Sequence, residues 1–163
     1  MAKTRTEHSK YKGVFVNTTD MRKLRAGIQA KMQDIVARII ESLTYIGEEC
    51  VRIARESGSY NDITGNLRSS IGYVVLHDGQ PVVNGASKQY KGKKGNGEAG
   101  PAAAESLLQK LQSEYPSGIV LIVCAGMNYA AYVEHVHHKD VLTTAELKAE
   151  SLLKSLLNGY IEP

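Results

Sequence analysis

The sequence has no apolar run long enough to cross a membrane. Its longest uncharged apolar run, Ile119 to Ala125, is far shorter than the roughly 18–20 residues that a membrane helix needs. No apolar stretch near Met1 has the character of a signal peptide. The sequence therefore predicts a protein with no membrane partner that is made in the cytoplasm.

Cysteine and aromatic residues are also scarce. Cys50 and Cys124 lie far apart in apolar segments, without the paired spacing of a zinc or redox motif. We expect both to be buried free thiols that are too inert for nucleophilic catalysis. Aromatic residues make up 6% of the chain, and few of them are near the basic segments. A typical nucleic-acid-binding face interleaves the two kinds of side chain.

Motifs for catalysis and for cofactor binding are missing. No serine occurs in a Gly-x-Ser-x-Gly turn, and Gly92–Gly97 lacks the Gly-Lys-Ser/Thr sequence of a phosphate-binding loop. The segment Glu134–Asp140 contains three histidines, but no second cluster completes a metal shell, so solvated imidazoles in a turn are the simpler interpretation. We expect no catalytic residue, no metal and no cofactor, and hence no enzyme.

Positive charge is concentrated in two segments. Residues 1–25 carry seven Lys or Arg against two acidic residues, and residues 84–97 carry four lysines and no acid. The net charge of the whole chain is only +3, so the remainder is acidic. The basic segments are either solvated, flexible arms or surfaces that dock on something acidic, for example a neighbouring copy of this chain.

Apolar periodicity predicts a long first helix. From Met21 to Ile53, large apolar residues recur every three or four positions, close to the period of an α-helix. Thr19 or Asp20 is expected to cap its start, and Gly58 follows its last turn. Such a helix would be about 55 Å long, which is longer than a compact domain of this size is wide. We therefore expect it to bend near a glycine or to pack against another subunit.

Strand signals follow in the middle of the chain. Asp78-Gly79 predicts a hairpin turn between a strand over residues 71–76 and a short strand around 82–83. The seven apolar residues Ile119–Ala125 predict a central strand that is covered on both faces. These strands are expected to form one small sheet.

Two further helices and a glycine-rich loop complete the pattern. A helix is predicted over residues 101–115, and a last helix is predicted from Thr143, where Glu146 gives capping-box spacing, to residues 158–159. Residues 84–100 contain five glycines and four lysines. This composition buries too little apolar surface to offset its ordering entropy, so it predicts a mobile loop.

These elements predict an α+β fold with a long N-terminal α-helix packed on a small, mainly antiparallel β-sheet and two further helices. The expected organisation is a basic N-terminal arm over residues 1–19 and a single α+β domain over residues 20–160, with the flexible Gly/Lys loop at 84–100.

Two short segments carry a family resemblance. Asp62–Ile71 reads Asp-Ile-Thr-Gly-Asn-Leu-Arg-Ser-Ser-Ile, and Gly126–Glu134 reads Gly-Met-Asn-Tyr-Ala-Ala-Tyr-Val-Glu. In this order, after a long helix and after a core strand, they resemble the paired signature of the tail-completion (neck) proteins of long-tailed bacteriophages. Asp140–Thr143 is similar to a subset of these proteins in phages and prophages of gut bacteria. The chain departs from the signature at His135–His137, where many members have an aromatic-Gly-Thr sequence.

The resemblance implies a structural virion protein of the neck or tail. Such a protein forms a ring, expected to contain six subunits, between the head connector and the tail tube. Its partners would be other copies of itself, connector or stopper proteins and the tail tube protein, while DNA passes through the ring without specific binding. The alternative is a nucleic-acid-binding module that uses the basic arm and the lysine-rich loop.

The first motif is expected to have a structural role. Thr64 to Leu67 should form a tight turn, with Leu67 and Ile71 inserted in the core. Gly65 should adopt a backbone conformation that a side chain would penalise.

The second motif is expected to lie near a subunit boundary. Tyr129 and Tyr132 each combine a large apolar surface with a hydroxyl, a combination enriched at interfaces, and Glu134 could face a basic arm of a neighbour. The alternative is that both rings pack inside the domain. The assembly residues of the loop are expected to be Lys88, Lys91, Lys93 and Lys94.

Overall fold

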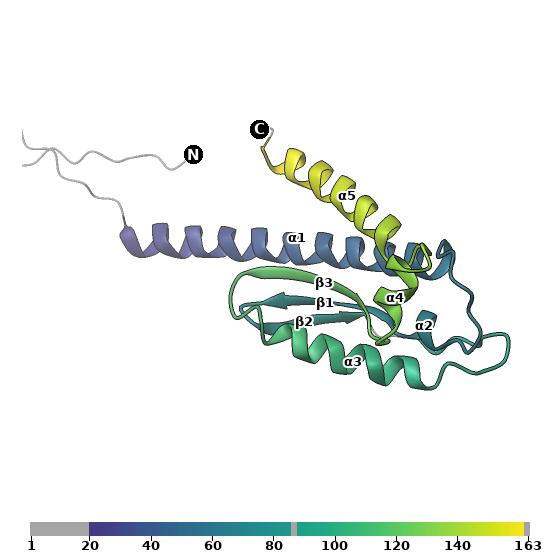
Figure 1. Cartoon of the computed structure of the whole chain (residues 1–163). Helices are drawn as coiled ribbons and strands as arrows, with labels where there is room; N and C mark the ends of the chain where they lie inside the picture. Colours follow the sequence, from purple (N-terminus) through teal and green to yellow (C-terminus); the bar gives the residue numbers. More distant parts are fainter. Residues whose placement is uncertain (1–19, 86–87, 162–163) are drawn as a thin grey trace, which may run out of the picture. The chain divides into compact units, whose positions relative to one another are not determined.

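The computed structural model describes residues 20–85 and 88–161, and their side chains as far as Asn158 (Figure 1). The arm expected over residues 1–19 lies outside the described residues. Within them, the elements are α1 (Met21–Glu56), α2 (Asn66–Ser69), β1 (Ile71–His77), β2 (Gln80–Gly85), α3 (Ala99–Gln112), β3 (Ile119–Ala125), α4 (Ala130–His135) and α5 (Thr143–Ile161). This α+β composition, with a long first helix and an antiparallel sheet, confirms the predicted fold class.

The chain divides into two compact units, residues 1–39 and residues 40–163. The division falls within α1. The sequence, by contrast, predicts a single domain over residues 20–160.

Asp20 caps the first helix. Its Oδ1 accepts the amide of Arg22 at 3.0 Å and that of Lys23 at 3.4 Å, and these are amides that have no partner within the helix. The helix then continues without interruption through Gly27 and Gly47 and ends close to the predicted position.

β1 and β2 form the predicted hairpin. Asp78 and Gly79 have φ angles of 49° and 75°, the left-handed pair that the type I′ turn of an Asp-Gly sequence requires. The strands are antiparallel, with His77 opposite Gln80. Asp78 also ties the hairpin to the start of β3, because its Oδ1 accepts the amide of Gly118 at 2.9 Å and its own amide donates to the carbonyl of Gly118 at 2.8 Å.

The central strand of the sheet is β1. Among the described residues the strand order is β2-β1-β3, and both pairings are antiparallel. Ile71 to Leu76 are all buried, whereas only Ile122 and Cys124 are buried in β3. The prediction that Ile119–Ala125 is the central strand is therefore wrong. A continuous apolar run shows that a strand is hydrophobic, but it does not show whether one neighbour or two will pair with it.

Helices cover both faces of this sheet, α3 on one face and the part of α1 after residue 40 on the other (Figure 1). Tyr73 of β1 points toward α1, where its ring lies against Gly47 so closely that a Cβ would not fit. The opposite face packs against α3 in a cluster of buried residues: Val74, Leu76, Leu108, Ile122 and Cys124.

Two short helices, α2 and α4, were not predicted from the sequence. With four and six residues, they are too short for an apolar period to repeat. The helix predicted from residue 101 begins two residues earlier, so Pro101 lies inside the first turn of α3.

The start of α5 also differs from the prediction. Instead of pairing with Glu146 in a capping box, Thr143 donates its hydroxyl hydrogen to Glu134 Oε1 at 2.6 Å. The amide of Thr144 donates to Asp140 Oδ1 at 3.1 Å. The helix continues to Ile161, beyond its expected end.

Candidate functional site

The structure brings the two signature motifs together. Ser70, at the end of α2, accepts the amide of Gly126 on its carbonyl at 2.9 Å and the amide of Met127 on its hydroxyl at 3.3 Å. Leu67 is 5% exposed and Ile71 is fully buried. Two segments more than fifty positions apart in the sequence thus form one buried junction in the second unit.

Gly65 has the conformation that the sequence suggests. Its φ is 81°, in the left-handed region that side chains rarely adopt. A Cβ at this position would also collide with the carbonyl of Tyr90 and the amide of Gly92. Thr64 is exposed, and its carbonyl accepts the amide of Gly97 at 2.9 Å.

Residues 90–97 of the glycine-lysine loop run along the first motif. The amide of Lys93 donates to the carbonyl of Asp62 at 3.1 Å, and the amide of Lys94 donates to the carbonyl of Ile63 at 2.7 Å. Tyr90 is attached in the same way, since its amide donates to Ser69 Oγ at 2.7 Å. By composition alone these glycines predict a mobile loop, because glycine raises the conformational entropy of the backbone. Here the absence of side chains lets two backbones approach within hydrogen-bonding distance.

The loop lysines are exposed beside this backbone contact. The side chains of Lys88, Lys91, Lys93 and Lys94 are all exposed. The loop therefore presents positive charge to solvent from a backbone that is bonded to the motif.

Tyr129 and Tyr132 differ in their surroundings. Tyr129 is partly buried and lines a cavity of about 580 Å³ together with Thr64 and Leu67 of the first motif and Val133 of α4. This burial raises the pKa of its hydroxyl. Tyr132 is 55% exposed, and its ring stacks edge-on against His137 at 5.1 Å. Neither ring is enclosed by the domain, and Tyr132 presents its surface to solvent.

Glu134 is bonded within the chain. Its Oε1 accepts the amides of Leu142 at 3.1 Å and Thr143 at 2.9 Å, in addition to the Thr143 hydroxyl. Burial acts to raise the pKa of this carboxyl and is the largest single influence on it. The hydrogen bonds from Thr143, Leu142 and Val141 together outweigh burial and lower the pKa. Glu134 thus holds the start of α5, and the predicted contact with a neighbour stays a prediction.

Both cysteines are buried free thiols. Burial raises the pKa of Cys124 to about 11, and burial followed by the charge of Glu49 raises that of Cys50. The Cys50 thiol donates to the carbonyl of Ala145 at 3.5 Å, where α5 contacts α1. A thiol that stays protonated is a poor nucleophile.

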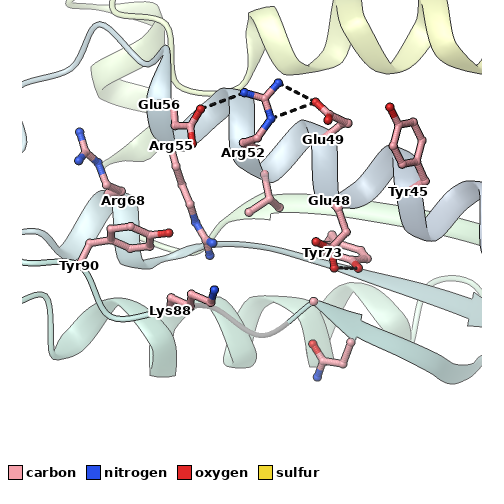
Figure 2. A pocket seen from close by; sticks show the side chains of 13 residues that line it. Tyr45, Glu48, Glu49, Arg52, Arg55, Glu56, Arg68, Tyr73, Lys88 and Tyr90 are labelled. Carbon is pink, nitrogen blue, oxygen red and sulfur yellow. Dashed lines mark hydrogen bonds and ion pairs between the residues drawn. The ribbon is translucent and has the colours of Figure 1, made fainter.

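A pocket of about 840 Å³ that is lined by several charged side chains lies where α1, the hairpin and the start of the loop meet (Figure 2). We call it the arginine pocket; six of the residues that line it are Arg52, Arg55, Arg68, Tyr73, Lys88 and Tyr90. Most of its charged groups are paired. Arg52 binds Glu49 at 2.8 Å and Glu56 at 2.9 Å.

Tyr73 and Glu48 also pair at this pocket. The Tyr73 hydroxyl donates to Glu48 Oε1 at 3.0 Å. Burial, with this hydrogen bond and the charge of Glu48, raises the pKa of Tyr73 to about 12. Tyr73 therefore stays a neutral hydrogen-bond donor at physiological pH.

Sequence reasoning missed the arginine pocket. The sequence held only a weak signal for it, a spacing of four that places Arg55 on the same helix face as three small or apolar residues. The structure shows that all four are buried: Leu43, Gly47, Val51 and Arg55. Nothing in the sequence shows that Gly85, Lys88 and Tyr90 would line the same pocket as Val51 and Arg55.

The first unit has one clear feature. Over residues 20–39, large apolar side chains at helical spacing are about half exposed or more: Met21, Leu24, Ile28, Met32 and Ile35. We call this set the apolar stripe. It is an unusually regular row of solvent-exposed apolar surface on one helix face.

Residues 20–85 and 88–161 contain no group of three His, Cys, Asp or Glu side chains arranged to hold a metal ion. None of the helices in these ranges is both long enough and apolar enough to cross a membrane. Comparisons of the chain with protein-family models, with curated proteins and with solved structures find no similar protein.

Proposed function

We propose that this chain is a structural, non-enzymatic subunit of the neck of a long-tailed bacteriophage. In this role it forms a ring, expected to have six subunits, that joins the head connector to the tail tube. The proposal begins from the motifs Asp62–Ile71 and Gly126–Glu134. Their contact through Ser70 supports it, because a paired signature is expected to be a structural unit.

The observation that carries the proposal is the apolar stripe. Met32, for example, is 62% exposed. Removing such side chains from water is favourable by about 25 cal/mol per Å² of apolar surface that is buried. A regular row of them on one helix face is typical of a surface that another helix or subunit covers.

Charge favours a second copy of this chain as the occupant. Residues 20–39 carry five Lys or Arg and two Asp, whereas residues 40–163 carry eleven Lys or Arg and fourteen Asp or Glu. A basic helix is attracted to the acidic body of a neighbour, and identical contacts repeated around an axis close a ring. Connector or stopper proteins and the tail tube protein would then contact the faces of this ring in the virion.

The test compares two substitutions on α1 in the full chain. Ile28→Asp places a charge in the apolar stripe, and Ala30→Asp places the same charge on the opposite side of the helix, where Ala30 is exposed. Sedimentation and native mass spectrometry should show rings for the wild type and Ala30→Asp, and monomers with unchanged helix content for Ile28→Asp. A wild type that stays monomeric at every concentration, or rings from Ile28→Asp, would contradict the proposal.

The exposed loop lysines favour one other function, a nucleic-acid-binding module. Lys88, Lys91, Lys93 and Lys94 lie on a backbone that is hydrogen-bonded to the first motif. Phosphate contacts by these lysines would give an affinity for duplex DNA that falls steeply with salt. Replacing all four by Gln should then abolish binding, whereas a ring subunit should self-associate and show little affinity for free DNA.

A further inference from the structure

Arg55 is buried with unused hydrogen-bonding capacity. Its side chain is 8% exposed, and its Nη2 donates to the carbonyl of Ile71 at 2.6 Å. Within the described residues its buried Nε has no acceptor. Its Cζ lies 5.1 Å from the centre of the Tyr90 ring. Figure 2 shows the side chain reaching from α1 into the space that Tyr90 and Lys88 border.

The carboxylates around the arginine pocket are engaged with other donors. Glu49 and Glu56 both bind Arg52, and Glu48 accepts the hydroxyl of Tyr73 at 3.0 Å. Beside the pocket, Asp62 Oδ2 and Arg68 Nε form an ion pair at 3.2 Å, without the geometry of a hydrogen bond. Among the residues that the structure describes, Arg55 therefore has no carboxylate partner of its own.

A guanidinium group carries its positive charge throughout proteins, on the surface and in the interior alike. A buried charge without a counter-charge is costly. The planar fork of a guanidinium matches two oxygens of a carboxylate or a phosphate group, and such charge-assisted hydrogen bonds are among the strongest in proteins.

We infer that the arginine pocket binds one oxyanion, a carboxylate or a phosphate group, through Arg55. The volume of about 840 Å³ admits such a group. Lys88, which lines the pocket with an exposed side chain, adds a second positive charge at its edge. Tyr90 holds the guanidinium in place by stacking. This site shares no residue with the apolar stripe, so anion binding can be measured separately from the effect of the stripe on ring formation.

The experiment is isothermal titration calorimetry on the full chain with inorganic phosphate and, separately, with acetate, at constant ionic strength set by NaCl. We expect saturable binding of at least one anion with a Kd on the order of 1 mM and a rise in the melting temperature at saturating anion. Binding of phosphate alone assigns the site to phosphate groups. Binding of acetate as well shows that the site also accepts carboxylates, including one carried by a protein partner.

Three variants test the assignment. Arg55→Lys keeps the charge but loses the fork, and it should weaken binding by about tenfold or more. Lys88→Gln, at an exposed position that tolerates change, should weaken binding several-fold, so the inference stays testable if Arg55→Lys fails to fold. Lys110→Gln on α3 removes an exposed charge elsewhere and should bind as the wild type does. Absence of saturable binding by both anions, or wild-type affinity in Lys88→Gln, would overturn the inference.

Discussion

The two halves of α1 have the same apolar period and opposite exposure. Met32, in the first half, is 62% exposed, whereas Ile46, in the second half, is 2% exposed. Both positions belong to a row of apolar residues spaced by three or four. Helical periodicity therefore identifies the face of a helix that will be covered. It does not say whether the cover comes from the same domain or from another molecule.

Truncating one apolar side chain in each half of α1 tests whether the two halves contribute differently to the free energy of unfolding. Ile46→Ala should lower the free energy of unfolding by about 2–5 kcal/mol, because it leaves a cavity in a packed core. Ile28→Ala, at a position that is 53% exposed, should change it by less than about 0.5 kcal/mol. Urea denaturation at concentrations that keep the chain monomeric measures both values. Equal losses would show that the first half of the helix is covered within the monomer.

Leu67→Ala extends the comparison to the first motif. Leu67 is 5% exposed, so the truncation should also cost about 2–5 kcal/mol in the same measurement. A loss below about half a kcal/mol would mean that the motif serves an exposed contact instead of the core. The exposed neighbour Ile63 provides the control, since Ile63→Ala should have little effect.

Glu134→Gln tests a polar residue that sequence reasoning assigned to an interface. The substitution weakens three hydrogen bonds at the start of α5, so we expect a loss on the order of 1 kcal/mol, as for other helix caps. Because the pKa of Glu134 is lowered in the folded chain, its carboxylate stabilises the fold above its ordinary value of 4.5, and this contribution is lost as the pH falls through the lowered value.

Urea denaturation at several pH values measures this effect. The wild type should lose more stability on acidification than Glu134→Gln. Glu114→Gln, at an exposed position after α3, should keep the acid dependence of the wild type. If Glu134→Gln melts as the wild type does at every pH but fails to assemble, Glu134 is an interface residue after all.

The last prediction concerns the local stability of the glycine-lysine loop, whose backbone is hydrogen-bonded to the first motif while its lysine side chains are exposed. Hydrogen exchange on the folded chain should be slowed at the amides of Lys93, Lys94 and Gly97, which donate to the first motif. Exchange at the rate of an unfolded chain would instead support the mobile loop that the composition predicts.

The sequence was sufficient for those elements whose signals are local. The period of α1, the cap at Asp20 and the Asp78-Gly79 turn each depend on neighbouring residues, and all three agree with the structure. The features that it missed depend on distant residues. Glu134 caps a helix that begins nine positions later, and Arg55 meets Tyr90 only after the chain folds back. No local pattern reports such pairings.

The sheet has a consequence for the order in which the domain folds. His77 pairs with Gln80 across a two-residue turn, but the same residue pairs with Ile119 across the whole loop and α3. The entropy cost of closing a loop grows with the number of residues in it. The hairpin is therefore expected to form early, and β3 to add later, once α3 has formed. The pairing of β3 with β1 completes the burial of β1. Before β3 has paired, the folding chain exposes an apolar edge of β1, and at this stage it is most prone to aggregate.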